Sequence, residues 1–238
     1  MRHTPAKLLL AVLLFLSFLH SAAASPLDTA DALVKTEIVG NIEEGMHLLQ
    51  EYLETYPGDG QALWRLARAH LYLGDRVEDN VLEIYQSGLA YAEQAIGLLP
   101  DSPDAHYWHA TLLGRVGQTQ GVLNSLAMVN PMKEALDRVL EIDPEYAAAY
   151  YVLSLLYKEA PGWPISIGSR RRSLENAEKA VELDPHDPEF RYNLAEIHVY
   201  NNNSRQAIQT LEYLLATDTI AEYPDIQKSA LTLLAELQ

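Results

Sequence analysis

Residues 188–202 read PEFRYNLAEIHVYNN, and this stretch carries the pattern that decides the fold. Its apolar residues recur at spacings of three and four, as one face of a helix requires. Directly before it, VELDPHDP (residues 181–188) ends an earlier apolar helical run at Pro185. Because proline cannot continue a helix, the two stretches together predict one helix that stops and a second that follows.

The same arrangement occurs four times along the chain. YLETYPGD, IGLLPDSP, LEIDPEYA and VELDPHDP end helical runs at Pro57, Pro100, Pro144 and Pro185, which are 43, 44 and 41 residues apart. The runs that follow are QALWRLARAHLYLGD, DAHYWHATLLGRVGQ, AAAYYVLSLLYKE and PEFRYNLAEIHVYNN. No segment shows the alternation of a strand. Repeats of this period predict an all-α, right-handed solenoid, in which stacked helix pairs bury the faces that one pair cannot bury alone.

The unit that begins at Pro188 resembles the tetratricopeptide repeat (TPR), a helix-turn-helix family. Leu194 and Ala195 stand where the family places a large and then a small residue, and Ala207 stands where the two helices cross closely. The resemblance implies five units and a C-terminal cap, with bounds near 26–59, 60–102, 103–146, 147–187, 188–221 and 224–237.

The units are longer than those of the family, and we expect the extra residues between the two helices of a unit, at 76–83, 119–130 and 159–173. Extended units such as YAEQAIGLLPDSPDAHYWHATLLGRVGQTQGV resemble the helical domain of the regulator of microtubule dynamics family. They also resemble the T-component lipoproteins of tripartite ATP-independent periplasmic transporters. This chain lacks the cysteine of those lipoproteins, because it has no cysteine at all.

The composition excludes several classes of function. Without cysteine the chain has no disulfide framework, thiolate metal site or cysteine nucleophile. Its formal net charge is −16, so its surface repels nucleic acid and anionic lipid headgroups.

Residues 1–24 predict a secretory signal peptide, in which Arg2 and Lys7 precede the apolar run LLLAVLLFLSFL and an A-x-A cleavage site at Ala22–Ala24. The run is shorter than the ~20 residues of a spanning helix. We therefore expect a periplasmic or secreted product, cleaved after Ala24 and not inserted in a membrane. Retention of the segment as an anchor is the alternative. Cleavage removes two positive charges and no acid, which changes the net charge from −16 to −18.

The stretch EAPGWPISIGSRRRS (159–173) interrupts this helical pattern. Its prolines and glycines favour turns, and Ser169 can cap a new helix, so we expect a connector that Trp163 and Ile165 hold against the array. The alternative is an anion site at the helix N-terminus, formed by Arg170, Arg171 and Arg172.

No set of residues in the sequence supports catalysis, a cofactor or a bound metal. His106 and His109 lie three apart on a helix, but at positions that the TPR family packs inside the helix pair. DPHDP (184–188) falls in a turn between units, where aspartates serve as caps.

Aromatic residues recur at one register of the predicted repeats. In the TPR family the concave groove is lined by positions 2, 5, 9, 12 and 13 of each first helix. Two readings stay open, a ligand groove and internal packing, since helix faces also need aromatics for their core. The candidate groove residues are Trp64, Tyr107, Tyr151 and Tyr192 at position 5, Tyr72 and Tyr200 at position 13, and Arg68 and Arg115 nearby.

These features together predict an exported, non-enzymatic scaffold that binds a protein segment or another ligand in an aromatic-lined groove. The alternative is a ligand-holding periplasmic accessory of a solute transporter.

Overall fold

The computed structural model describes residues 25–238, and the predicted signal peptide lies outside these residues. The fold in the described part is all-α, as predicted. The elements are α1 (Pro26–Val34), α2 (Val39–Thr55), α3 (Gly60–Gly74), α4 (Val81–Leu98), α5 (Pro103–Thr119), α6 (Val122–Ile142), α7 (Ala147–Glu159), α8 (Arg170–Leu183), α9 (Pro188–Tyr200), α10 (Ser204–Leu215), the 3₁₀ helix η1 (Asp218–Glu222) and α11 (Pro224–Leu237).

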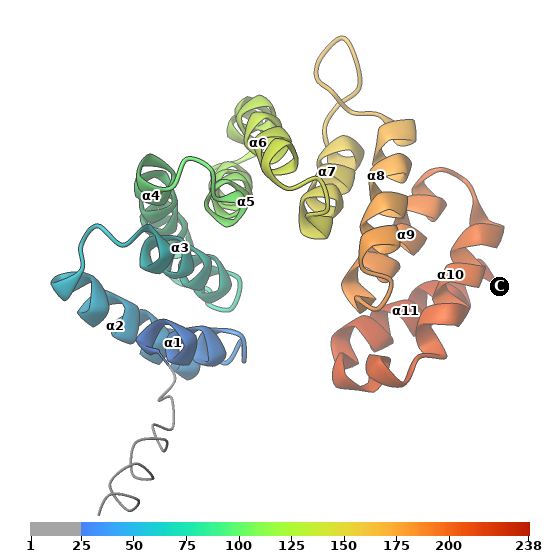
Figure 1. Cartoon of the computed structure of the whole chain (residues 1–238). Coiled ribbons are helices and arrows are strands. Elements are labelled where there is room, and N and C mark those ends of the chain that lie inside the picture. The colour runs from blue at the N-terminus through green and yellow to red at the C-terminus, as the bar shows by residue number, and fades with distance from the viewer. Residues whose placement is uncertain (1–24) are drawn as a thin grey trace, which may run out of the picture.

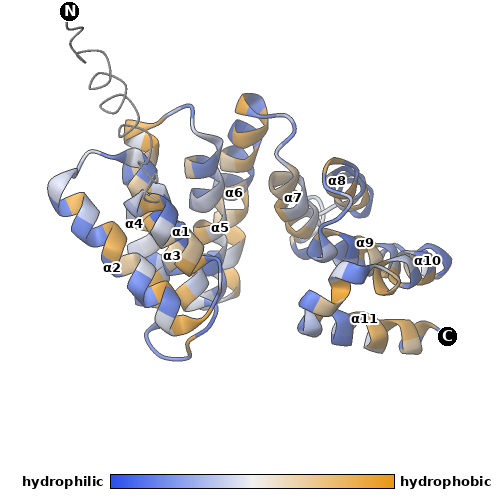
Figure 2. Ribbon diagram, turned by 60° about the horizontal axis from the view of Figure 1, so that its bottom comes forward, coloured by the Kyte–Doolittle hydropathy of each residue, from blue (hydrophilic) through white to orange (hydrophobic). Residues whose placement is uncertain are grey.

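Consecutive helices pack against each other and form an arc (Figure 1). The pair α1–α2 lies at one end of the arc, and α9, α10 and α11 lie at the other. Hydrophobic and hydrophilic residues share the same helices (Figure 2), and the buried hydrophobic residues lie where neighbouring helices pack. None of the helices from residue 25 onward combines the length and hydropathy that a membrane span needs.

The second helix of four units ends with the same backbone geometry. Tyr56, Leu99, Asp143 and Asp184 close α2, α4, α6 and α8 with φ angles of −128°, −130°, −131° and −130°. Each of these residues directly precedes one of the four repeating prolines, whose rings disfavour a helical conformation at the residue before them. The next helix then begins at an Asp or Ser cap in three places: Asp59, Ser102 and Asp187 accept backbone N–H bonds of α3, α5 and α9.

The two helices of a unit cross at nearly backbone contact. A Cβ atom added to Gly45 would lie 3.0 Å from the carbonyl oxygen of Ala30, and one added to Gly88 would lie 3.3 Å from that of Ala67. In the fourth unit the hydroxyl of Ser173 donates to the carbonyl oxygen of Ser154 at 2.9 Å. Only small side chains leave room for such an approach.

Polar side chains join each unit to the next. Their partners are 37 to 42 residues apart in sequence, which is close to the repeat spacing of 41 to 44 residues. The pairs are Arg68–Asp31 (2.6 Å), Arg115–Asp75 (2.9 Å), Arg138–Asp101 (2.6 Å), Tyr146–Asp104 (2.9 Å), Tyr151–Glu189 (2.9 Å) and Asn193–Ser154 (2.7 Å).

Two expectations about the extra residues of the units are wrong. Residues 119–130 do not form a connector, because α5 continues to Thr119 and α6 begins at Val122; the extra residues lengthen α6 to 21 residues. Residues 160–169 do connect α7 to α8, and Ser169 caps α8 by accepting from the Arg172 N–H. However, Trp163 is 89% exposed and Ile165 is 69% exposed, so neither side chain holds the connector against the array.

Three histidines are buried or half-buried between the helices. His70 and His198 are buried, and the Nδ1 of His109 is enclosed without a hydrogen-bond partner. Burial lowers the pKa of all three, and that of His109 falls to about 4 with a smaller contribution from nearby His106. The described residues contain no group of three or more metal-ligating side chains, and the His106 Nε2 lies 2.9 Å from the carbonyl oxygen of Pro100.

The close crossing of α9 and α10 can be tested by enlarging Ala207, which is fully buried. Ala207→Leu should overpack the crossing and cost about 1–3 kcal/mol of unfolding free energy. Gln209→Leu, which adds a leucine at an exposed position of the same helix, is the matched control. Thermal or urea unfolding measures both variants. Equal stability of Ala207→Leu and the parent would contradict this packing.

The buried histidines should make the protein less stable in mild acid. Folded His109 stays neutral between its lowered pKa of about 4 and its ordinary value of 6.5, whereas the unfolded chain takes up a proton there. The free energy of unfolding should therefore fall as the pH drops below 6.5, with His109 contributing about 1–2 kcal/mol by pH 5.

Urea unfolding at pH 7 and pH 5 measures this effect. His109→Gln should lose less stability than the parent between these pH values. His47→Gln, at a side chain that is 64% exposed, should lose as much as the parent. The same loss in His109→Gln as in the parent would refute the assignment.

Candidate binding groove

A groove of about 1070 Å³ lies on the concave side of the arc. Its walls come from α3, α5, α6 and α7, from the start of α9, and from both ends of the array. At the N-terminal end the connection between α1 and α2 contributes residues 35–37, and at the C-terminal end η1 and α11 contribute residues 222–226. The groove lining therefore includes residues from both ends of the array.

Four of the predicted residues line this groove: Tyr72 of α3, Tyr107 and Arg115 of α5, and Tyr151 of α7. The three tyrosine side chains are half-buried, and Tyr107 and Tyr151 also pack against the core cluster around Leu136 and Val152. The two interpretations of the recurring aromatic residues, a ligand groove and internal packing, thus apply to the same side chains. One side of each ring supports the fold, and the other side borders the groove.

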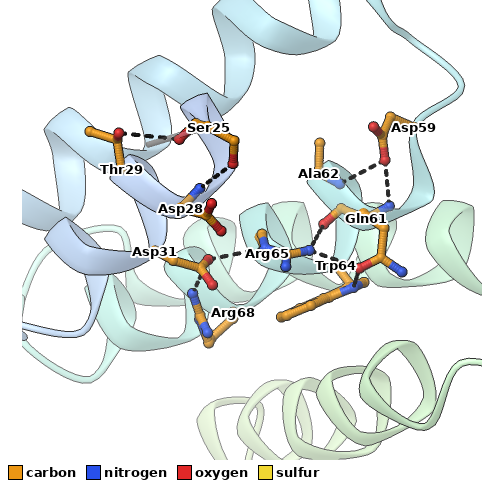
Figure 3. A network of polar contacts seen from close by, with 10 residues as sticks. All are labelled: Ser25, Asp28, Thr29, Asp31, Asp59, Gln61, Ala62, Trp64, Arg65 and Arg68. Carbon is orange, nitrogen blue, oxygen red and sulfur yellow. Dashed lines mark hydrogen bonds and ion pairs between the residues drawn. The ribbon is translucent and has the colours of Figure 1, made fainter. Parts of the chain in front are cut away.

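Trp64 and Arg68 do not line the groove, contrary to our expectation. Trp64 is 7% exposed, and its Nε1 donates to the Gln61 side chain at 3.0 Å. The guanidinium groups of Arg65 and Arg68 lie 4.2 Å and 5.5 Å from its ring centroid, and both arginines pair with Asp31 of α1 (Figure 3). This network covers the indole and removes it from the concave surface.

The C-terminal members of the aromatic set also have other partners. Tyr192 packs against the apolar cluster that α11 forms with α9 and α10, around Leu211 and Ala230. Tyr200 lies beneath the Arg170 guanidinium, 4.9 Å from its ring centroid. Neither belongs to the groove lining.

Three groove features were not among the predicted site residues. Trp108, one residue after Tyr107, joins the rings of Tyr72 and Tyr107 with centroid distances of 5.8 Å and 4.8 Å. The lengthened α6 adds the apolar side chains of Leu126, Val129 and Met132 to the wall. Glu189 stands at position 2 of its unit, which the TPR register would have included, and its carboxylate accepts a hydrogen bond from the Tyr151 hydroxyl at 2.9 Å.

Fixed polar contacts set the charges of the groove. Arg115 holds Asp75 with two contacts of 2.9 Å, and the Tyr85 hydroxyl donates to the same carboxylate at 2.6 Å. At the N-terminal rim Arg76 pairs with Glu37. Burial raises the pKa of Tyr107 and Tyr151, and the Tyr151 hydroxyl donates its hydrogen bond to Glu189.

The three consecutive arginines do not point to a common ligand. Arg170 lies over Tyr200, Arg171 pairs with Glu175 at 2.7 Å, and Arg172 lies 5.5 Å from the ring centroid of Tyr157. Successive helical residues point about 100° apart, which accounts for the three separate partners. Within residues 25–238, Arg171 is the one arginine of the three that forms an ion pair with a glutamate.

Comparison with solved structures identifies the fold. A thermophilic TPR protein of Thermus thermophilus superposes with a TM-score of 0.73 at 18% identity, over 88% of this chain and 97% of that one. MamA of Desulfovibrio magneticus RS-1 gives a TM-score of 0.52 at 21% identity, over 82% and 96%. The sequence profile of a tetratricopeptide repeat matches residues 168–237.

Sequence relatives identify the family. Regulator of microtubule dynamics protein 1 of Mus musculus is 27% identical over 162 residues, which cover 61% of this chain and 52% of the relative. Protein 2 of Homo sapiens is 26% identical over 216 residues, which cover 82% and 52%. The chain thus spans about half the length of these relatives. The family profile described as regulator of microtubule dynamics protein 1-3 matches residues 27–158, more than half of the chain, and the chain belongs to this family.

Proposed function

We propose that this protein is a non-enzymatic scaffold that holds a segment of a partner protein in the concave groove. The observation that carries the proposal is the groove itself, whose side walls present Tyr72, Tyr107, Trp108 and Tyr151 from three successive units. Aromatic side chains supply large contact areas at a modest cost in conformational entropy, and they dominate the energetics of protein interfaces. A TPR array generally serves such binding, because stacked units form an extended concave surface.

The size and chemistry of the groove favour a peptide segment. The groove of about 1070 Å³ runs from residues 35–37 at one end of the array to residues 222–226 at the other, so an extended segment can lie along it. The apolar wall of α6 and the tyrosine hydroxyls together suit a ligand with alternating apolar and polar groups. The relatives are named for an effect on microtubule dynamics, and the residues that match their family profile, 27–158, include Tyr72, Tyr107, Trp108 and Tyr151. We therefore propose that the partner binds to the surface formed by these aromatic residues, which lie in the part of the chain that matches the family profile.

We also propose that the chain is exported and acts after cleavage behind Ala24, in the periplasm or outside the cell. The basic start, the apolar run and the A-x-A site of residues 1–24 support this. A role beside a solute transporter stays a prediction, and no feature of the groove favours it over a partner protein.

Export can be tested by N-terminal sequencing of the protein from its native host. We expect a chain that begins at Ser25 in the periplasmic or extracellular fraction. A change of Ala22 and Ala24 to Arg should leave the precursor uncleaved, because the cleavage site needs small residues. Recovery of an unprocessed chain from cells of the parent strain would contradict export.

Binding can be tested with residues 25–238 as bait, followed by mass spectrometry and titration of the captured partner. Tyr107→Ala and Tyr151→Ala should each weaken binding of that partner about tenfold or more, since truncating a hot-spot aromatic costs about 2 kcal/mol or more. Tyr213→Ala, at an exposed tyrosine outside the groove lining, is the control and should bind as the parent does. Loss of melting temperature in the two groove variants with unchanged affinity would show that the rings serve packing alone.

A further inference from the structure

The groove lining carries an excess of negative charge. Its carboxylates outnumber its cations by seven to three, and two of the three cations are already engaged in the ion pairs Arg115–Asp75 and Arg76–Glu37. Lys35 is the third. The remaining carboxylates are Glu159, Asp187, Glu189, Glu222 and Asp225. The excess negative charge therefore lies on the same surface as the aromatic rings of the groove.

Glu189 is the best placed of these carboxylates to meet a ligand. It lies in the first turn of α9, where the Tyr151 hydroxyl donates to it at 2.9 Å and fixes its position beside the rings of Tyr151 and Phe190, whose centroids are 5.2 Å apart. Within residues 25–238 no lysine, arginine or histidine forms an ion pair with Glu189. The side chain is nevertheless open to solvent, so a ligand can reach it.

The surroundings of Glu189 leave its negative charge poorly compensated. Its pKa is raised, chiefly because the nearby groove walls displace part of the water around this solvent-accessible carboxylate, and Asp187 adds repulsion; the Tyr151 hydrogen bond and Arg115 offset only part of this. The pKa of Asp187 is raised by burial as well. Arg115 cannot turn to Glu189 without giving up its two contacts with Asp75. A cation brought by a ligand would supply what the groove lacks.

We propose that the groove binds a basic segment of a partner protein, with an arginine or lysine of that segment seated against the Glu189 carboxylate and the neighbouring tyrosine rings. This inference rests on the proposed function and adds the chemistry of the partner. An arginine fits both features, because its planar fork pairs with a carboxylate and its face stacks on aromatic rings. The net charge of −16 also steers a basic partner toward the protein and repels an acidic one.

The test uses residues 25–238 and three fluorescently labelled ten-residue peptides of otherwise equal sequence, carrying four arginines, four glutamines or four glutamates. Fluorescence anisotropy at 0.15 M salt limits attraction by distant charges, because the screening length there is about 8 Å. The arginine peptide should bind the parent at least tenfold more tightly than the glutamine peptide, and the glutamate peptide should bind least. Equal binding of the arginine and glutamine peptides would overturn the inference.

Glu189→Gln removes the charge but keeps an oxygen that can accept the Tyr151 hydrogen bond, so the variant should fold as the parent does. Glu44→Gln makes the same change of net charge at an exposed position of α2 that does not line the groove. Glu189→Gln should weaken the arginine peptide about fivefold or more, as the loss of a close charge pair does, and Glu44→Gln should weaken it less than twofold. Equal effects of the two changes would mean that the peptide senses only the overall charge, which overturns the inference.

Tyr107→Ala separates this inference from the proposed function. If Tyr107→Ala weakens the arginine peptide and Glu189→Gln does so too, both stand. If peptides of all three charges bind the parent equally and Tyr107→Ala weakens each of them, groove binding stands and the basic partner is wrong. If Tyr107→Ala binds every peptide as tightly as the parent does, the groove is not the binding surface, and both the proposed function and this inference are wrong.

Discussion

Three of the helix pairs of this protein depend on a crossing at which one backbone carbonyl nearly touches the partner helix. Ala30 faces Gly45 in the first unit, Ala67 faces Gly88 in the second, and Ser154 accepts from the Ser173 hydroxyl in the fourth. The crossing fixes how far apart the two axes lie, and so which residues of each helix meet the next unit. A larger side chain at these positions would separate the helices and misalign every unit stacked on them. The small residues therefore set the geometry, while the leucines around them supply burial.

The curvature that forms the groove depends on contacts between units. The Arg68–Asp31, Arg115–Asp75 and Tyr151–Glu189 contacts each join neighbouring units, at N–O or O–O distances of 2.6 to 2.9 Å. Two of these three also lie in the groove lining. Residues that hold successive units in register are thus the same residues that charge the groove. A substitution at Asp75 would for this reason alter both the stacking and the surface that a ligand meets.

The sequence predicted those parts of the fold that depend on neighbouring residues along the chain. A proline in each inter-unit turn fixes the residue before it, so the ends of α2, α4, α6 and α8 could be read directly. The length of α6 was not predicted, because the comparison with the shorter units of the TPR family assigned its first residues to a connector. The spacings of four and three between Val122, Leu126 and Val129 already indicated a helix. The exposure of Trp163 could not be predicted, since a hydrophobic side chain in a turn carries no sign of what it faces.

The same position of the repeat does not have the same role in every unit of this array. Trp64, Tyr107, Tyr151 and Tyr192 occupy equivalent places in four units, but only the middle two border the groove. At the N-terminal side Arg65 and Arg68 reach across to Asp31 and cover Trp64, and at the C-terminal side α11 covers Tyr192. The helices α1 and α11 lie at the two ends of the array, where a unit has a neighbour on one side only. Their contacts engage the position-5 rings of the second and fifth units, so at this register only the rings of the third and fourth units are left free for a ligand.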